Sequence, residues 1–378
     1  LWAIQWTRGK TSGRTEKEGM NQSRRIFPNI NILAALAAFV VLIACRPEAE
    51  GNRGAAIDSA GEEPMGEWHG VELGDEIWKV GRMEGPEYEV LGKIADVTFV
   101  GTGLAVSDSH SDRIHWYDDS GIHRMSAGGS GGGPGEFVRV HSLDILPDGT
   151  LVAVDGGSRG IEFFGEDGNS TDHLLFPGSI EEMCLLDSTM VVLGTVDDSD
   201  LPLHLIDLAD GSLASIGSTT APESDSRNRG ALVLGLLGGS IGCMADRIVY
   251  ARSSDGMVGA LDRDGSVLWE VEMPSFLAIV YEDDGERGIK TSAPEGATEF
   301  HVFHSVTRFG QTVAVQIQRI SLGTRDVSIS TVFLELASGE ILGEDGSLPM
   351  IMAVKGDRIA VVREAPIPEL AVYSFSHR

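Results

Sequence analysis

Ser109-His110-Ser111-Asp112 contains the three side-chain types of a nucleophile, a general base and an orienting acid within four consecutive residues. Acyl transfer through a serine requires a hydroxyl, an imidazole and a carboxylate in one line of hydrogen bonds. Adjacent residues on a short loop cannot reach that alignment. We therefore interpret the segment as a polar loop, in which His110 is a candidate ligand contact.

Two dense carboxylate clusters have the oxygen ligands that Ca²⁺ prefers. They are Asp197–Asp200 and Glu282–Glu286. Neither cluster has the ligand spacing of a known calcium loop, and we favour solvated acidic loops in so acidic a chain. A divalent cation such as calcium therefore stays an open cofactor assignment.

His301 and His304 are the remaining candidates for metal ligation. The residues around them predict a strand, and residues of odd separation on a strand point to opposite faces of the sheet. The two imidazoles cannot then chelate one ion, so we expect them in the core or at its rim.

The charge balance narrows the class of partner. The chain has 57 Asp and Glu against 29 Lys and Arg, which gives a net charge of −28. Nucleic acid binding requires basic residues that displace counterions from phosphates, and a polybasic membrane-surface mode requires them too. The composition argues against both and favours a soluble acidic surface or a site for cations.

An export signal begins at Met20. Arg24 and Arg25 precede an apolar run over residues 32–44, and Cys45 follows directly. This tripartite order is typical of a removable signal segment. Leu42-Ile43-Ala44-Cys45 resembles the lipobox of bacterial lipoproteins, and the resemblance implies that Cys45 carries the lipid. An ordinary signal peptide with an incidental cysteine is the alternative.

The flanking segments complete the expected organisation. We interpret residues 1–19 as a mis-assigned gene start, residues 20–44 as the signal, and residues 45–75 as a flexible acidic tether. Ser23–Phe27 also resembles the start of a twin-arginine signal, so the export route stays open. Arg46 after the lipid site, where Asp would suggest inner-membrane retention, favours the outer membrane of a host with two membranes.

Residues 76–378 show an internal repeat. Short apolar runs alternate with Asp-Gly or Ser-Gly turns, as in Ile94–Gly121 and again in His141–Gly168. Each stretch predicts four antiparallel strands, and a spacing of about 45 residues matches one blade of a β-propeller. The rhythm continues with decreasing clarity to the C-terminus, where the last repeat lacks one strand.

An isolated strand-like run, Ile77–Arg82, precedes the first full repeat. Pairing this run with the last repeat would complete a blade and remove the exposed sheet edges of an open ring. Five complete repeats and one shared repeat predict a six-bladed propeller. An eight-stranded sandwich pair is the alternative, but it explains neither the period nor the incomplete last repeat.

The second repeat carries the clearest motif. Gly131–Phe137, the turn Pro147-Asp148-Gly149, and the strands Leu151–Asp155 and Ile161–Phe164 resemble a blade of NHL-repeat-type six-bladed propellers. Bacterial lipoproteins of this kind are common. The resemblance implies a structural role for Asp108 and Asp155, which would cap the loop after the second strand by accepting backbone N–H groups. Ligand contact is the alternative for both.

Cys184 and Cys243 fall on the predicted innermost strands of neighbouring blades. An extracytoplasmic setting permits a disulfide. Small buried thiols are common in strands, and we favour unbonded cysteines.

We expect a lipid-anchored, monomeric binding module of the cell envelope, for a polar ligand or a protein partner. A metal-dependent hydrolase or lyase with a lactonase-like site in the central channel is the alternative. Two long links, Thr219–Gly230 and Pro274–Ala297, favour a binding face over the fourth and fifth blades. Flexible surface insertions without a role are the alternative for both links. The candidate contacts on that face are Asp198, Arg227, Arg229, Arg252, Asp255, Arg287, Lys290 and Arg325.

Overall fold

The computed structural model describes residues 70–196, 199, 201–217, 238–283, 289–324, 326–364 and 366–377. All of these belong to one compact unit, which spans Glu63–Arg378. Strands dominate this part of the chain, and its only helical segment is the 3₁₀ turn η1 (Glu87–Glu89). No helix among the described residues is long and apolar enough to cross a membrane.

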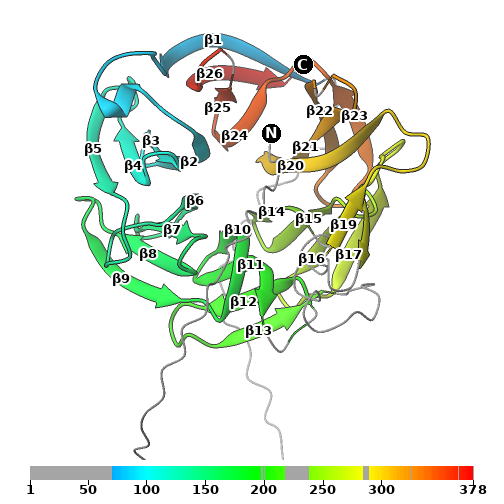
Figure 1. Cartoon of the computed structure of the whole chain (residues 1–378), viewed down its shortest axis with the longest axis horizontal. Helices are drawn as coiled ribbons and strands as arrows, with labels where there is room; N and C mark the ends of the chain where they lie inside the picture. Colours follow the sequence, from blue (N-terminus) through cyan, green and yellow to red (C-terminus); the bar gives the residue numbers. More distant parts are fainter. Residues whose placement is uncertain are drawn as a thin grey trace, which may run out of the picture. The chain divides into compact units, whose positions relative to one another are not determined.

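Six four-stranded antiparallel sheets form a ring, which confirms the predicted six-bladed β-propeller (Figure 1). Blade 1 contains β2 (Ile94–Val100), β3 (Gly103–Asp108), β4 (Arg113–Tyr117) and β5 (His123–Gly128). Blade 2 contains β6 (Val140–Ile145), β7 (Leu151–Asp155), β8 (Gly160–Phe164) and β9 (Ser170–Leu175). Blade 3 contains β10 (Gly178–Leu186), β11 (Thr189–Val196), β12 (Leu203–Asp207) and β13 (Leu213–Ile216).

The remaining blades follow the same order, with the first strand of each blade innermost. Blade 4 contains β14 (Gly239–Met244), β15 (Arg247–Arg252), β16 (Met257–Asp262) and β17 (Val267–Glu272). Blade 5 contains β20 (Glu299–Phe309), β21 (Thr312–Ser321), β22 (Val327–Glu335) and β23 (Ile341–Asp345). Blade 6 contains β24 (Met350–Lys355), β25 (Arg358–Arg363), β26 (Glu369–His377) and, from the start of the chain, β1 (Val71–Val80).

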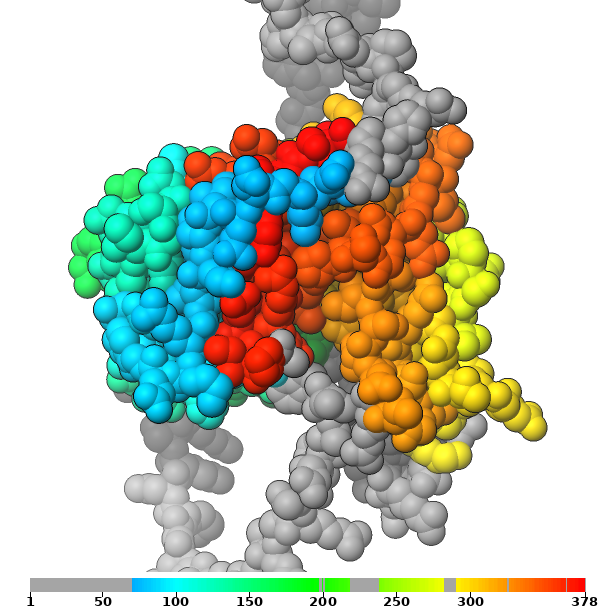
Figure 2. Space-filling view, turned by 90° about the horizontal axis from the view of Figure 1, so that it is seen from above, coloured from blue at the N-terminus to red at the C-terminus, as the bar shows by residue number. Residues whose placement is uncertain are grey.

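Blade 6 closes the ring as the shared last repeat predicts. β1 pairs antiparallel with β26, with Trp78 opposite Val372, and Figure 2 shows the two segments side by side in blue and red. The strand begins at Val71, five residues before Glu76, where the sequence pattern places the start of the propeller. Val71 is 2% exposed and packs in the core between blades 5 and 6, which explains the earlier start.

Apolar side chains fill the space between each pair of adjacent blades. Six separate core clusters exist among the described residues, one for each junction of the ring. The second strand of a blade contacts neighbours on both faces, so Leu151–Asp155 is buried at every position. This is why the second strands appear in the sequence as nearly continuous apolar runs.

The link between blades 4 and 5 differs from the expected long loop. It contains a separate two-stranded hairpin of β18 (Val280–Asp283) and β19 (Ile289–Ser292), which pairs with no blade. The other long link, Thr219–Gly230, lies outside the described residues. The Asp-Gly turns predicted in blade 2 are present, since Gly149 and Gly168 have φ values of +92° and +73°.

Candidate functional site

The innermost strands share a β-bulge near one end of the central channel. A register shift occurs in β2, β6, β10, β20 and β24, and within the described residues β14 shows none. The five bulged residues are Ala95, His141, Glu181, His304 and Met352. A bulge redirects a side chain and is frequent beside functional sites. Three of the five residues are polar, so the bulges place titratable groups at equivalent levels around the ring.

His141 reaches from blade 2 to blade 3. Its Nε2 lies 3.1 Å from the backbone oxygen of Glu181, and a carbonyl oxygen can only accept, so Nε2 carries the proton. The other ring nitrogen, Nδ1, is then an acceptor, and it is buried without a hydrogen-bond partner. Desolvation and the charge of Arg139 lower the pKa of His141. Both effects favour the neutral form of the imidazole.

Arg139 connects the neighbouring charged groups. Desolvation raises the pKa of Glu181, and Arg139 opposes this shift. Desolvation also lowers the pKa of Lys93. The charge of Glu364 raises this pKa, and the charge of Arg139 lowers it further. Arg139 is exposed, and its guanidinium donates to the backbone oxygen of Gly156 at 3.4 Å. We call Lys93, Arg139, His141 and Glu181 the polar rim.

Asp108 and Asp155 hold the polar rim in place. Asp155 accepts the N–H of Gly157 in the loop after its strand, as predicted, at 2.9 Å. Asp155 also accepts the N–H of Arg139 at 2.8 Å, and Asp108 accepts the N–H of Lys93 at the same distance. Each carboxylate thus fixes the backbone of a basic residue at the equivalent position of blades 1 and 2. Their role in the structure is positional.

His110 borders this region. Its backbone N–H donates to Asp108 at 3.0 Å, and its exposed ring lies against Gly92, where an added Cβ would come within 2.7 Å of the ring. The hydroxyl of Ser111 donates to Asp108 and not to His110. The segment is a polar loop, as expected, and it contains no aligned triad.

The candidate contacts of blade 4 satisfy each other. The guanidinium of Arg252 donates to both carboxylate oxygens of Asp255, at distances of 2.6 to 2.9 Å. This ion pair raises the pKa of Arg252, although desolvation opposes it. Lys290 lies in β19. Cys45, Asp198, Arg227, Arg229, Arg287 and Arg325 lie outside the described residues.

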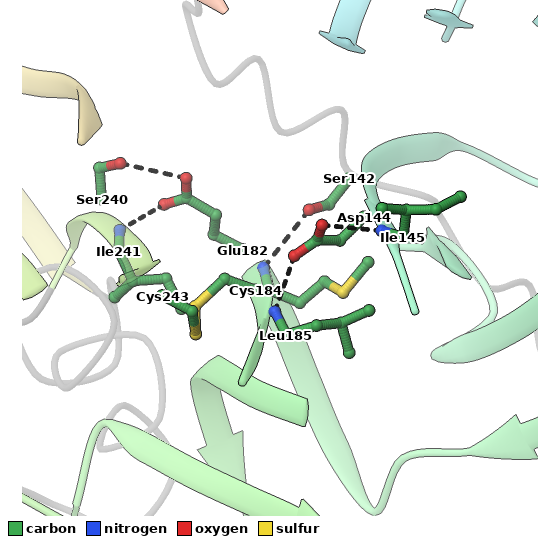
Figure 3. The surroundings of a disulfide bond; sticks show 10 residues. Ser142, Asp144, Ile145, Glu182, Cys184, Leu185, Ser240, Ile241 and Cys243 are labelled. Atoms are coloured by element: carbon green, nitrogen blue, oxygen red, sulfur yellow. Dashed lines mark hydrogen bonds between the residues drawn. A yellow bond between two sulfur atoms is a disulfide. The ribbon is translucent and has the colours of Figure 1, made fainter. Parts of the chain in front are cut away.

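Three carboxylates that the sequence patterns did not single out fasten the innermost strands of blades 1 to 4. Asp96 accepts the N–H of Leu143, and Asp144 accepts that of Leu185, both at 2.7 Å. Glu182 accepts the N–H of Ile241 at 2.9 Å (Figure 3). Desolvation raises the pKa of Asp96 to about 7, of Asp144 to about 6 and of Glu182 to about 8. Each carboxylate connects one blade to the next.

The expectation of unbonded cysteines was wrong. Cys184 on β10 and Cys243 on β14 form a disulfide, with Cα atoms 5.5 Å apart (Figure 3). The bond crosses the same junction as the contact between Glu182 and Ile241. Counted from the hairpin turn, Cys184 is the third residue of its strand and Cys243 is the second. This offset of one residue turns the two side chains toward each other across the junction, within the Cα separation that a disulfide requires.

No group of three or more His, Cys, Asp or Glu side chains in the described part of the chain could hold a metal ion. His301 accepts the N–H of Leu277 and contacts Glu299. Nε2 of His304 is buried and has no hydrogen-bond partner, and desolvation lowers its pKa to about 4. The two histidines therefore have different surroundings.

The comparisons with known proteins concern the fold. No protein-family model matches the chain, and no curated protein matches it. Two solved structures resemble it at a TM-score of 0.54. A candidate exported protein from Bacteroides fragilis is 10% identical, over 82% of this chain and 95% of that one. A member of the DUF4221 family from Bacteroides vulgatus is 11% identical, over 82% and 98%.

Proposed function

We propose that this propeller is a lipid-anchored module of the cell envelope that binds a polar ligand or protein partner at the polar rim. The proposal includes three further statements: Cys45 carries the lipid, the protein is monomeric, and its blades are of the NHL-repeat type. The disulfide between Cys184 and Cys243 supports an extracytoplasmic location, because disulfides persist in oxidising compartments.

The observation that supports this proposal best is that the charged groups of the polar rim influence one another's pKa values. Arg139 acts on Lys93, His141 and Glu181, which come from three blades. Perturbed titratable groups gathered at one place are typical of functional sites. Arg139 and Lys93 suit an anionic group of the ligand, while the carboxyl of Glu181 suits its hydroxyl or amine donors.

The lactonase-like alternative has less support. A channel metal in such an enzyme requires several converging oxygen or nitrogen ligands, and the described residues provide no such group. A binding function, in contrast, requires only the residues of the polar rim. The links over blades 4 and 5 stay a candidate extension of the same binding face.

The test uses the soluble segment 46–378 and a panel of small anionic probes with donor groups, namely sugar acids, hydroxy acids and acidic amino acids. Thermal shift identifies a stabilising probe, and calorimetry measures its affinity. Arg139→Gln should weaken binding about tenfold or more, because it removes a charged hydrogen bond. Arg308→Gln is the matched control, since Arg308 donates to Gly310 at a first turn. Equal loss in both variants, or a panel without any stabilising member, contradicts the proposal.

A further inference from the structure

A cavity of about 510 Å³ lies among the turns that join the first and second strands of blades 1, 2, 3 and 6. The polar rim lies near the start of the innermost strands, whereas these turns follow the end of them, so this is a separate place. The cavity has the size of pockets that hold small molecules.

Apolar side chains form part of the cavity wall. Phe99, Ile145 and Leu185 are near or at the ends of β2, β6 and β10, and all three line the cavity. They come from three consecutive blades. An apolar group that enters between them loses its contact with water, which favours its binding.

Asp148 provides a negative charge to the same cavity. The first turn of blade 2 spans residues 146–150, whereas the first turn of blade 1 has only Gly101 and Thr102 between its strands. Asp148 lies on this longer turn and accepts the N–H of Thr150 at 2.9 Å. That bond, together with the side chain of Thr150, lowers the pKa of Asp148 and keeps its carboxylate ionised.

Lys355 provides a positive charge from blade 6. Its ammonium donates to the oxygen of Gly101 at 2.7 Å. An ammonium has three donors, so two stay available for a ligand. The third charged residue of the lining, Asp187, already pairs with Arg263 at 2.6 Å. The cavity therefore offers one anchored cation, one carboxylate with a remaining acceptor, and an apolar wall.

We propose that this cavity binds a small zwitterion with apolar side chains, of the size of a dipeptide. Lys355 receives the ligand carboxylate, Asp148 receives the ammonium, and Phe99, Ile145 and Leu185 contact the side chains. A ligand with only one charge would leave one of the two protein charges without its partner. This is the basis for selecting a zwitterion over a simple amine or acid.

Calorimetry on segment 46–378 tests the site with three probes: Phe-Leu with free termini, its N-acetyl form and its C-terminal amide. The free dipeptide should bind, and blocking either terminus should weaken binding about tenfold or more. Asp148→Asn preserves the turn acceptor but removes the charge, so it should abolish the discrimination against the N-acetyl form. Lys355→Gln should abolish the discrimination against the amide.

Arg139→Gln is the control, because it alters the polar rim and leaves this cavity intact. Unchanged dipeptide binding in that variant separates this site from the rim. A melting temperature close to that of the wild type establishes that each variant is folded. The absence of measurable dipeptide binding to the wild type at millimolar concentration would overturn the proposal, and so would equal affinities for the three probes.

Discussion

Glu182 of blade 3 accepts the backbone N–H of Ile241 in blade 4 at 2.9 Å, and the same carboxylate accepts the hydroxyl of Ser240 at 3.1 Å. The contact is one of a series. Asp96, Asp144 and Glu182 each receive an N–H from the innermost strand of the following blade. Each of these side chains is half-buried, so the ring is held together by carboxylates for which ionisation is costly.

The stability of the propeller should fall as the pH rises from 6.5 to 8.5. Raised folded-state pKa values, about 7 for Asp96 and about 8 for Glu182, mean that the folded chain binds more protons than the unfolded chain in this range. The stabilisation is complete below pH 4 and is lost as the pH rises through these values. The histidines with lowered pKa values, such as His304, affect stability only below pH 6.5. There they make stability rise with pH, which is opposite to the effect of the carboxylates.

Thermal melts at pH 6.5 and 8.5 measure this effect. We expect a loss of about 1 kcal/mol, less than full burial would give, because the carboxylates are partly exposed. Glu182→Gln should reduce the pH dependence, while Glu272→Gln, an exposed site on β17, should leave it unchanged. Equal melting temperatures at the two pH values would show that these carboxylates do not titrate as described.

Reducing the disulfide should destabilise the ring at one junction. The bond between Cys184 and Cys243 closes a loop of 59 residues, and the chain-entropy model assigns such a bond about 4 kcal/mol. The double variant Cys184→Ser and Cys243→Ser should therefore melt several degrees lower than the oxidised protein. A reducing agent should lower the melting temperature of the wild type and leave that of the double variant unchanged.

The sequence predicts the parts of this molecule that depend on local patterns. Asp108 and Asp155 each end an apolar second strand before a turn, and this position, together with the resemblance to NHL-type blades, predicts their N–H contacts in the following loop. Their contacts with Lys93 and Arg139 were not predicted. The bulges at His141 and Glu181 were not predictable, because a bulge depends on the register between two strands and not on alternation within one. A sequence pattern that does not include the bulges places Asp96 and Glu182 on the exposed face of a strand, where acidic residues are ordinary.

The disulfide shows the same limit. The repeat places Cys184 and Cys243 on equivalent strands of adjacent blades, yet a bond requires a Cα separation that only the packed ring defines. The polar rim could have been found by aligning the blades, because Lys93 precedes Asp108 by 15 residues and Arg139 precedes Asp155 by 16. This shared position of the two basic residues becomes meaningful only when the hydrogen-bond partners of the two aspartates are known.

Removing β1 should open the ring. Without residues 71–80, the outer edge of β26 loses its partner, and Val372, which is 1% exposed and lies opposite Trp78, loses that cover. We expect aggregation or a large fall in melting temperature for segment 83–378. Segment 70–378, which lacks only the expected tether before Val71, should melt like segment 46–378. If segments 83–378 and 70–378 melted together, β1 would not stabilise the ring.

The lipid anchor is the prediction that decides where the propeller works. Cys45 follows an apolar run and the small residue Ala44, the order that precedes a lipidated cysteine in bacterial lipoproteins. Lipidation adds acyl chains that hold a protein at a membrane, and about 0.8 kcal/mol is gained for each buried CH₂. In cells that express the full chain, Cys45→Ser should therefore move the protein from the membrane fraction to the soluble fraction, or leave it with an unprocessed signal.

Fractionation with immunodetection, together with mass spectrometry of the N-terminus, distinguishes these two results. The double variant Cys184→Ser and Cys243→Ser is the control, because it changes cysteines without changing the lipid site, and it should stay with the membrane. Membrane association of Cys45→Ser equal to that of the wild type, with the signal removed, would mean that another feature of the chain anchors it.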